Sequence, residues 1–241
     1  MWCFWRQNRA DGQLTLDSET ISTSHVISSL APPNLASIIS DLTFPTSPRT
    51  SVGVVSLVFP VPPFQIHPDG FGYLIPRPSD PSFNPSGILG VVFDSTALPG
   101  LDSIQGVTKL TIMMGGPYWS SYHPTIPRPA SGKDLVPLAL EHVRTVFPSI
   151  RDIEPALVLS SLHKDCIPTY TTGHAARTRS LHQEIVGSPW NGKLSLVGNA
   201  FAGVGVNDCV WSAEQMVEAL ANGRSATGLE AWATSTPERL P

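Results

Sequence analysis

Four short apolar runs follow one another in the first half of the chain with no helical pattern between them. They lie at residues 52–59, 71–75, 88–93 and 109–115. Each is rich in β-branched and aromatic residues and is bounded by Pro, Gly, Asn or Asp, which is typical of strands. Because strands that follow one another without crossover helices pair as hairpins or meanders, the sequence predicts an antiparallel sheet.

A helix is predicted after these strands. Its apolar residues recur at helical spacing, and Pro148 ends the pattern. They are Val136, Leu140, Val143 and Phe147. An apolar face of this kind is expected to pack on the sheet. Residues 156–162 then predict a further strand, and residues 174–185 a short helix.

The two ends of the chain carry a different pattern. Residues 24–30 predict a buried strand, followed by a weak helical pattern at 35–39. Near the other end, an apolar strand at 194–197 leads through a glycine-rich connection at 198–206 into a helix at 209–220. The predicted apolar face of that helix consists of Val210, Ala213, Val217 and Leu220. The tail after Gly228 is expected to be frayed.

Composition excludes several classes of function. The chain has 15 Lys and Arg against 19 Asp and Glu, and its basic residues form no run, which argues against a nucleic-acid partner. The three cysteines are not spaced as a disulfide framework or a zinc motif. No apolar run is long enough to span a membrane, and the first residues have the pattern of neither a signal peptide nor a presequence.

Charged residues make up only 14% of the chain, against about 25% in an average domain. A surface so sparing in charge is compatible with a partner surface or a nearby membrane.

The glycine-rich connection is the strongest candidate for a ligand site. Gly203 and Gly205 allow close approach of the backbone, and the N-terminus of the following helix would point at an electron-rich group, such as the edge of a flavin. The alternative is that the glycines only allow close strand–helix packing and that Asn207 or Asp208 caps the helix. On spacing alone the alternative is favoured, because GVGVND lacks the third glycine of GxGxxG.

Other catalytic patterns are weaker. There is no GxSxG elbow, and His163 and Cys166 have no second pair with which to hold a metal, so no metal site is expected. His174 and His182 are expected to be partly solvated. Asp94 ends a predicted strand, where capping a turn is a simpler role than general base.

Several motifs, in the same order along the chain, resemble those of the protoporphyrinogen oxidases, in particular the fungal-like members of the family. The last of them resembles the flavin-contacting motif of the family, and together they extend from about residue 20 to 222. They are HVIS at 25–28, GFGYLIP at 70–76, GILGVVFDS at 87–95, TIMMGG at 111–116, CIPTY and GH between 166 and 174, and LVGNAFAGVGVNDC at 196–209. Thr169 departs from the family's Gln in CIPQY.

The resemblance implies an enzyme that oxidises protoporphyrinogen IX to protoporphyrin IX. FAD would accept hydride in successive rounds, and molecular oxygen would reoxidise it to give peroxide. By resemblance, the fold is α+β: an antiparallel substrate-binding sheet with a packed helix at residues 44–190. Partial elements of a Rossmann-like FAD-binding domain would flank it at residues 1–43 and 191–241.

The resemblance also assigns residues to the two ligands. The residues that would approach FAD are Val26, Gly198, Gly203, Val204, Gly205 and Val206. The residues that would line an apolar slot for the tetrapyrrole are Phe71, Gly72, Leu74 and Met113. No side chain is assigned as catalytic, because the substrate needs an apolar slot beside the flavin and few catalytic groups.

The GxGxxG segment that holds the FAD pyrophosphate in the family has no counterpart before His25, nor do its membrane-binding helices and propionate anchor. The sequence therefore predicts a C-terminal portion that is unstable alone. It would be a natural fragment, an incomplete gene model, or a half that works with an N-terminal half in trans or as a homodimer. By resemblance it would be peripherally associated with the mitochondrial inner membrane.

Two other functions stay open. One is a non-catalytic fragment that binds a tetrapyrrole, which flavin occupancy would distinguish from the oxidase. The other is an amine-oxidase-type relative with another substrate, against which the GFGYLIP and TIMMGG strands argue.

Overall fold

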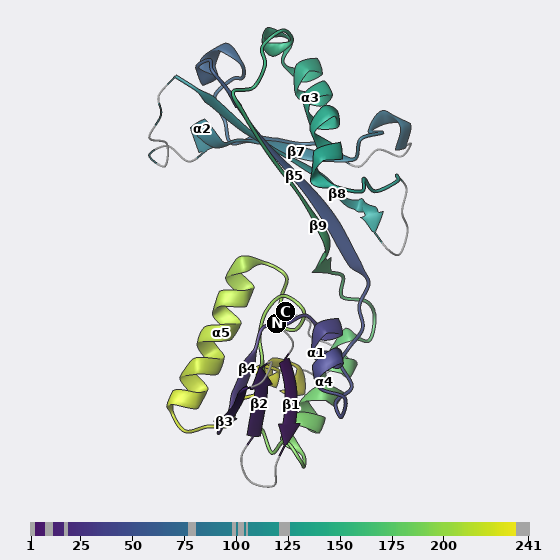
Figure 1. Cartoon of the computed structure of the whole chain (residues 1–241), viewed down its shortest axis with the longest axis vertical. Coiled ribbons are helices and arrows are strands. Elements are labelled where there is room, and N and C mark those ends of the chain that lie inside the picture. Colours follow the sequence, from purple (N-terminus) through teal and green to yellow (C-terminus); the bar gives the residue numbers. More distant parts are fainter. Residues whose placement is uncertain are drawn as a thin grey trace. The chain divides into compact units, whose positions relative to one another are not determined.

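The chain folds into two units, each with its own apolar core. The computed structural model describes residues 3–7, 12–16, 19–76, 81–97, 100, 104, 106–120 and 126–234. Unit 1 is formed by residues 1–47 and 168–241, and unit 2 by residues 48–167 (Figure 1).

The boundaries differ from the predicted 44–190 for the sheet-bearing part. Helix α4 (His174–Val186) belongs to unit 1, because Leu181 and Ile185 are buried in the same apolar core as Leu194 and Leu196.

Unit 2 is built on a five-stranded sheet of order β6-β7-β8-β5-β9. Its strands are β5 (Arg49–Phe59), β6 (Gly72–Leu74), β7 (Ile88–Phe93), β8 (Thr108–Ser120) and β9 (Leu157–Pro168). The pairs β5–β8, β7–β8 and β6–β7 are antiparallel. The predicted antiparallel sheet is therefore confirmed, with β8 and β9 longer than expected.

Helix α3 (Leu135–Val146) covers one face of this sheet. It buries Leu135, Ala139 and Val143, and Phe147 continues the same row beyond the helix end. The predicted apolar face was therefore partly wrong. Val143 and Phe147 are buried as predicted, whereas Val136 and Leu140 lie half-buried beside the buried row. Gly53 lies beneath Leu135, so close that a methyl group at that glycine would sit 2.5 Å from a Leu135 methyl carbon.

Short helices punctuate the connections in unit 2. They are η1 (Pro63–Gln65), η2 (Pro81–Phe83), α2 (Asp94–Ala97), η3 (Gly132–Asp134) and η4 (Pro148–Ile150).

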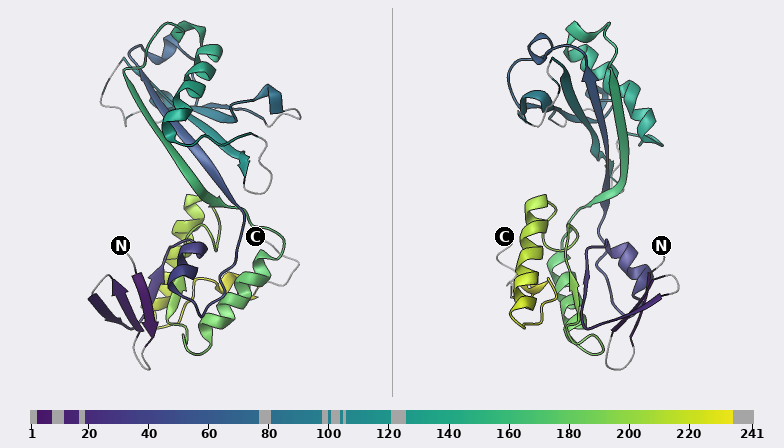
Figure 2. Two further views of the ribbon diagram at one scale, coloured as in Figure 1. Left: turned by 45° about the vertical axis from the view of Figure 1, so that its right-hand side comes forward. Right: turned by 60° about the vertical axis from the view of Figure 1, so that its left-hand side comes forward.

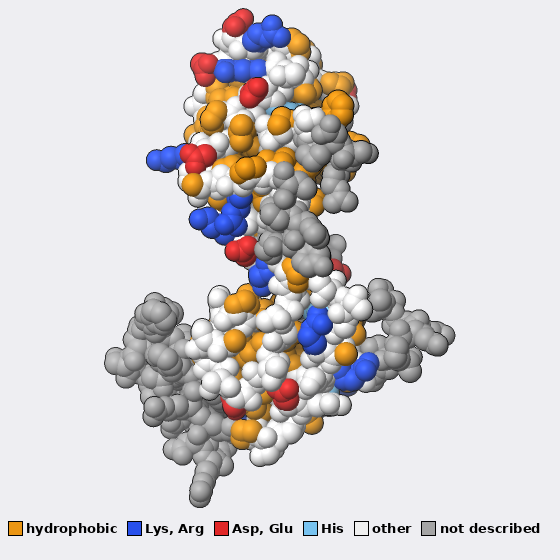
Figure 3. Space-filling view, turned by 90° about the vertical axis from the view of Figure 1, so that its right-hand side faces the viewer, with side chains coloured by type: hydrophobic (Ala, Val, Ile, Leu, Met, Phe, Trp, Pro, Cys, Tyr) orange, Lys and Arg blue, Asp and Glu red, His pale blue; other side chains and the backbone are white. Residues whose placement is uncertain are grey.

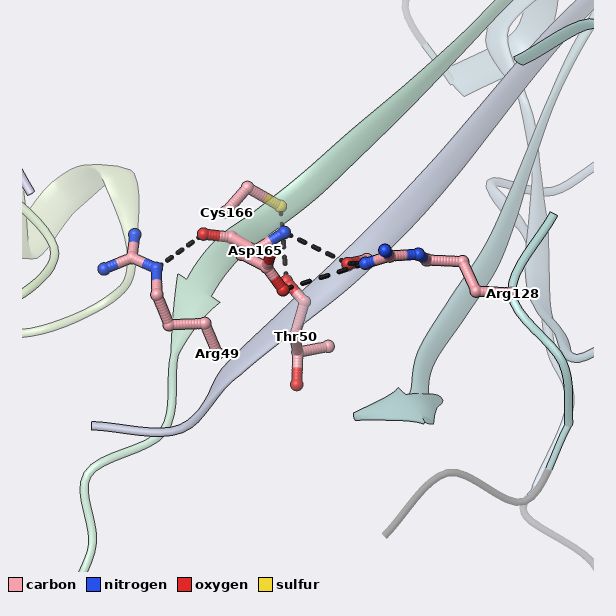
Figure 4. A network of polar contacts seen from close by, with 6 residues as sticks. Arg49, Thr50, Arg128, Asp165 and Cys166 are labelled. Atoms are coloured by element: carbon pink, nitrogen blue, oxygen red, sulfur yellow. Dashed lines mark hydrogen bonds and ion pairs between the residues drawn. The ribbon is translucent and has the colours of Figure 1, made fainter. Parts of the chain in front are cut away.

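Polar contacts join the strands by which the chain enters and leaves unit 2. The Ser51 hydroxyl accepts hydrogen bonds from Arg128 Nη1 at 2.7 Å and from the Asp165 N–H at 3.0 Å, and Arg49 Nε donates to the Asp165 carbonyl at 2.5 Å (Figure 4). Cys166 Sγ lies 3.6 Å from the Thr50 carbonyl oxygen. The start of β5 and the end of β9 are thus held together by side chains as well as by the sheet.

Unit 1 is organised around two parallel strands, β4 (Val26–Ser28) and β10 (Leu194–Leu196). Helix α1 (Pro32–Ile38) and α4 share one apolar core with β10, and α5 (Val206–Ala221) packs against a second cluster around Val197 (Figures 1 and 2). Strands β1 (Cys3–Gln7), β2 (Gly12–Leu16) and β3 (Glu19–Thr23) form a separate antiparallel sheet.

Helix α5 packs through a face that matches the predicted one only in part. It buries Ser212 and Met216, whereas Val210 and Val217 are 52% and 54% exposed. Ala213 and Leu220 of the predicted face are partly buried against the cluster of Val197, Met216 and Ala226.

The predicted frayed tail is also wrong as far as residue 234. Residues Glu230–Thr234 form helix α6, and Leu229 and Trp232 are buried. The buried side chains attach the segment to the core of unit 1.

Tyr73 and His142 join β6 to α3 on the covered face. The Tyr73 hydroxyl lies 2.8 Å from His142 Nε2. Burial raises the pKa of Tyr73 to about 12, and burial lowers the pKa of His142 from 6.5. The folded chain therefore holds this imidazole neutral at pH values where an unfolded chain would protonate it.

We expect Gly115→Ala to destabilise unit 2 by about 3 kcal/mol or more. Gly115 has φ +92°, and an added Cβ would lie 1.9 Å from the ring of the buried Trp119. Gly223→Ala is the matched control, because Gly223 has φ +71° but open space around it, and its cost should be about 1 kcal/mol. Urea unfolding followed by circular dichroism measures both, and equal costs would contradict the packing argument.

We expect His142 to make stability depend on pH. The contribution of His142 to the free energy of unfolding is complete above pH 6.5. It decreases as the pH falls toward the lowered pKa of His142, because the unfolded chain then binds more protons than the folded one. His142→Gln should therefore flatten the fall in Tm between about pH 7.5 and about pH 5. An unchanged slope in His142→Gln would refute the assignment.

Candidate functional site

The face of the sheet opposite α3 carries a continuous apolar row. In the register of the strands, Leu74 lies opposite Gly90, Gly90 opposite Met113, and Met113 opposite Val54. Directly paired residues project to the same face of a sheet, so these four form one row across four strands. Leu74 is 78% exposed, and Met113 and Val54 are half-buried.

A second cross-strand row lies beside the first, and its residues on β8 and β5 are polar. Gly72 lies opposite Val92, Val92 opposite Thr111, and Thr111 opposite Ser56. Thr111 Oγ1 donates to Asp94 Oδ2 at 2.7 Å and lies 3.1 Å from Ser56 Oγ. The two rows therefore form a mostly apolar surface with a hydrogen-bonded polar group at one side.

Three of the four predicted tetrapyrrole residues meet on this face: Gly72, Leu74 and Met113. Phe71 precedes β6 and is 68% exposed, while its carbonyl oxygen accepts a hydrogen bond from the Phe93 N–H. Sequence reasoning missed Val54, Gly90 and Val92, which only the strand register places beside Met113.

On the face drawn in Figure 3, hydrophobic side chains reach the surface of both units, with charged side chains among them.

Five of the six predicted flavin-contacting residues lie in unit 1 between β10 and the first residue of α5. Helix α5 begins at Val206, three residues earlier than predicted, and Gly205 is its N-cap residue. The Gly205 N–H donates to Asp208 Oδ2 at 3.1 Å. Val204 and Val206 are exposed, so the backbone at the helix start is reached from solvent.

The connecting loop, residues 198–205, is held by two aromatic side chains that sequence reasoning did not assign. The Tyr170 hydroxyl donates to the Asn199 carbonyl at 2.8 Å and accepts from the Gly203 N–H at 3.0 Å. Trp232 Nε1 donates to the Phe201 carbonyl at 2.7 Å. Burial raises the pKa of Tyr170, and the Gly203 N–H opposes that effect.

His174 fills the space between these two aromatic rings. Its ring stacks on Tyr170 with centroids 3.9 Å apart and meets Trp232 edge-on at 5.3 Å. It is 4% exposed, so the prediction of a partly solvated His174 is wrong. Burial lowers its pKa, and Arg177 lowers it further against an opposing effect of the Phe201 backbone.

Val26 lies on β4, on the other strand of the parallel pair, where it is half-buried against the unit 1 core. The neighbouring His25 Nε2 lies 2.7 Å from Ser195 Oγ, and the same hydroxyl donates to the Ala226 carbonyl. Ser195 is fully buried, and burial lowers the pKa of His25. This hydroxyl already donates to a carbonyl, so the pair joins strands rather than forming a nucleophile.

The start of α5 has the features expected for contact with a flavin. The first turn of a helix leaves N–H groups without partners inside the helix, and its dipole favours an electron-rich ligand. The exposed Val204 and Val206 would add apolar contact with a planar ring. Within the described ranges, no three His, Cys, Asp or Glu side chains gather as a metal site, and no helix is long and apolar enough to cross a membrane.

No family model matches the chain. It is 31% identical to human protoporphyrinogen oxidase over 217 residues, which covers 88% of this chain and 42% of the relative. It is 33% identical over 193 residues to the protoporphyrinogen oxidase of Schizosaccharomyces pombe, covering 78% of this chain and 36% of the relative. The chain thus spans about two-fifths of the length of the curated relatives it matches.

Two solved structures share the fold over most of the chain. A protein from Exiguobacterium sp. 255-15 assigned as a protoporphyrinogen oxidase superposes with a TM-score of 0.69 and 21% identity, covering 91% of this chain and 46% of that one. A reduced UDP-galactopyranose mutase superposes with a TM-score of 0.60 and 11% identity, covering 94% and 47%. The resemblance predicted from the motifs is therefore confirmed: over most of its own length, the chain is a relative of the protoporphyrinogen oxidases.

Proposed function

We propose that the chain provides the tetrapyrrole-binding sheet and the flavin-contacting loop of a protoporphyrinogen oxidase, which converts protoporphyrinogen IX to protoporphyrin IX. The observation that carries the proposal is the cross-strand row of Leu74, Gly90, Met113 and Val54 on the open face of unit 2. That row occurs in a chain whose curated relatives bear this enzyme's name.

The open face suits a broad and mostly apolar macrocycle. A ligand of this kind is bound by apolar contact with a few polar groups that fix its orientation. Gly90 is buried beside Leu74, whose Cδ2 would lie 3.0 Å from a Cβ at that glycine, so the surface offered to a ring system is formed by the side chains of Leu74, Met113 and Val54. The hydrogen-bonded Asp94 and Thr111 offer oxygen atoms at the side of this surface.

FAD would supply the redox chemistry, accepting hydride from the tetrapyrrole and passing electrons to molecular oxygen to give peroxide. The residues of this chain that would hold it are Val26, Gly198, Gly203, Val204, Gly205 and Val206. Their part is to bind and orient the ring: the N–H groups at the start of α5 would stabilise negative charge on it, and the valines would exclude water.

The full activity requires more than the two-fifths of the relatives that this chain spans. We propose that the remaining contacts to FAD come from a further segment or an N-terminal half in trans, and that homodimers form. By the same relationship we propose residence at the mitochondrial inner membrane with peripheral attachment.

A non-catalytic tetrapyrrole-binding protein is the second candidate. The observation in its favour is that the open face is assembled entirely from unit 2, whereas the loop at α5 belongs to unit 1. Unit 2 alone therefore carries the surface needed to bind a macrocycle without redox chemistry.

Flavin occupancy separates the two candidates. We expect the purified chain, incubated with excess FAD and desalted, to retain flavin absorbance most strongly when it is co-expressed with the N-terminal half of a related oxidase. That half would supply the pyrophosphate contacts, which hold much of the cofactor's affinity. Retention by the chain alone would also support the oxidase. Absence of flavin from both preparations would contradict it and favour the non-catalytic candidate.

Two adjacent methionines test the open face. Met113 lies on it, whereas Met114 is fully buried on the covered face. We expect Met113→Ser to weaken protoporphyrin IX binding roughly tenfold, by the loss of about 1.5 kcal/mol of apolar contact, with little change in Tm. Met114→Ala should lower stability by about 2–5 kcal/mol and leave the affinity of the folded fraction unchanged. Porphyrin fluorescence titration measures the first effect, and equal affinities in wild type and Met113→Ser would exclude this face.

A further inference from the structure

We propose that Tyr170 is a positioning residue whose hydroxyl fixes the loop of residues 198–205, so that the backbone at the start of α5 is preformed for the flavin. This inference rests on the proposed function, and it concerns a side chain that contacts the loop rather than the ligand.

The hydroxyl of Tyr170 joins two points of the loop that are four residues apart. Its hydrogen goes to the Asn199 carbonyl, and its oxygen accepts the Gly203 N–H. A phenol has one hydrogen to donate, so the two contacts are complementary and both depend on the same oxygen atom. Removing that atom would release both sides of the loop at once.

Gly203 is the residue at which the loop most needs such support. Its φ of +141° is a conformation that glycine adopts readily and other residues rarely do, and a Cβ here would lie 2.5 Å from Asp208 Cβ. The same Asp208 carboxylate accepts the Gly205 N–H, and Cys209 Sγ lies 3.7 Å from the Gly203 carbonyl oxygen. The position of Gly203 is therefore linked to the first turn of α5 on one side and to Tyr170 on the other.

The tyrosine is itself held in place by packing. His174 stacks on its ring at 3.9 Å and in turn contacts Trp232, which binds the Phe201 carbonyl between the two points that Tyr170 holds. Three loop groups, at residues 199, 201 and 203, thus have partners on one aromatic cluster. A glycine-containing loop that is already ordered loses less conformational entropy on binding a ligand, which favours affinity.

Tyr170→Phe tests the inference, because it removes the hydroxyl and keeps the ring that stacks on His174. We expect the Gly203 amide to exchange its hydrogen about tenfold faster in the variant, as measured by NMR on the chain without FAD. In the preparation that retains flavin, we expect FAD to dissociate about tenfold more readily and its visible absorbance bands to shift. A general loss of stability would not produce a spectral shift of this kind.

Tyr118→Phe is the matched control. Tyr118 is buried in unit 2, and its hydroxyl accepts a hydrogen bond from Asn84 at 3.0 Å, so the variant loses a buried phenol hydroxyl far from the loop in sequence. It should leave the Gly203 exchange rate and the flavin spectrum at wild-type values.

An unchanged hydrogen-exchange rate of the Gly203 amide in Tyr170→Phe would overturn the positioning role of Tyr170. Faster exchange accompanied by wild-type FAD affinity and a wild-type spectrum would overturn it too. Absence of flavin from every wild-type preparation would instead overturn the proposed function, and with it the proposal that the loop of residues 198–205 is preformed for FAD. The exchange rates would still decide whether Tyr170 orders the loop, so the two failures are distinguishable.

Discussion

The register between β7, β8 and β5 is the constraint on which both the core of unit 2 and its open face depend. Side chains alternate between the two faces of a strand, so a slip of one residue would move Met114 outward and Met113 into the core. Irregular pairing between Ile88 and Gly90, and between Thr50 and Val52, marks where the regular register begins. The same alternation therefore fixes what is packed under α3 and what remains available to a ligand.

Unit 1 shows how polar contacts complete what strand pairing begins. Its parallel pair has only three residues in each strand, and parallel strands are ordinarily buried within larger sheets. Side-chain bonds supplement the ladder: Ser195 joins His25 to the segment at Ala226, and Tyr170 and Trp232 order the loop after β10. Val206, Val210 and Val217 face outward and leave α5 with exposed apolar surface.

Local patterns predicted much of the fold. Residues 88–93 and the helix starting at His174 were found at their bounds or within a residue, because an apolar run between Gly87 and Asp94 marks the first and Gly173 and Gly187 bound the second. The motifs also indicated the loop before α5 and three residues of the open face. The burial of His174, the burial of Met216 on α5 and the ordered Trp232 were not predicted, since each depends on a neighbour distant in sequence. No spacing within 209–220 reveals that Met216 packs with Val197 and Ala226.

The connection of the two units has a consequence for folding. Unit 2 is one continuous segment, whereas unit 1 is assembled from two segments that flank it. A nascent chain can therefore complete unit 2 before the second half of unit 1 has been synthesised. The contacts of Ser51, Arg49, Arg128 and Asp165 then keep the two exits of unit 2 close together. When the two segments of unit 1 come together, the loop that must close is therefore short and does not include the whole of unit 2. A shorter loop lowers the entropic cost of closure.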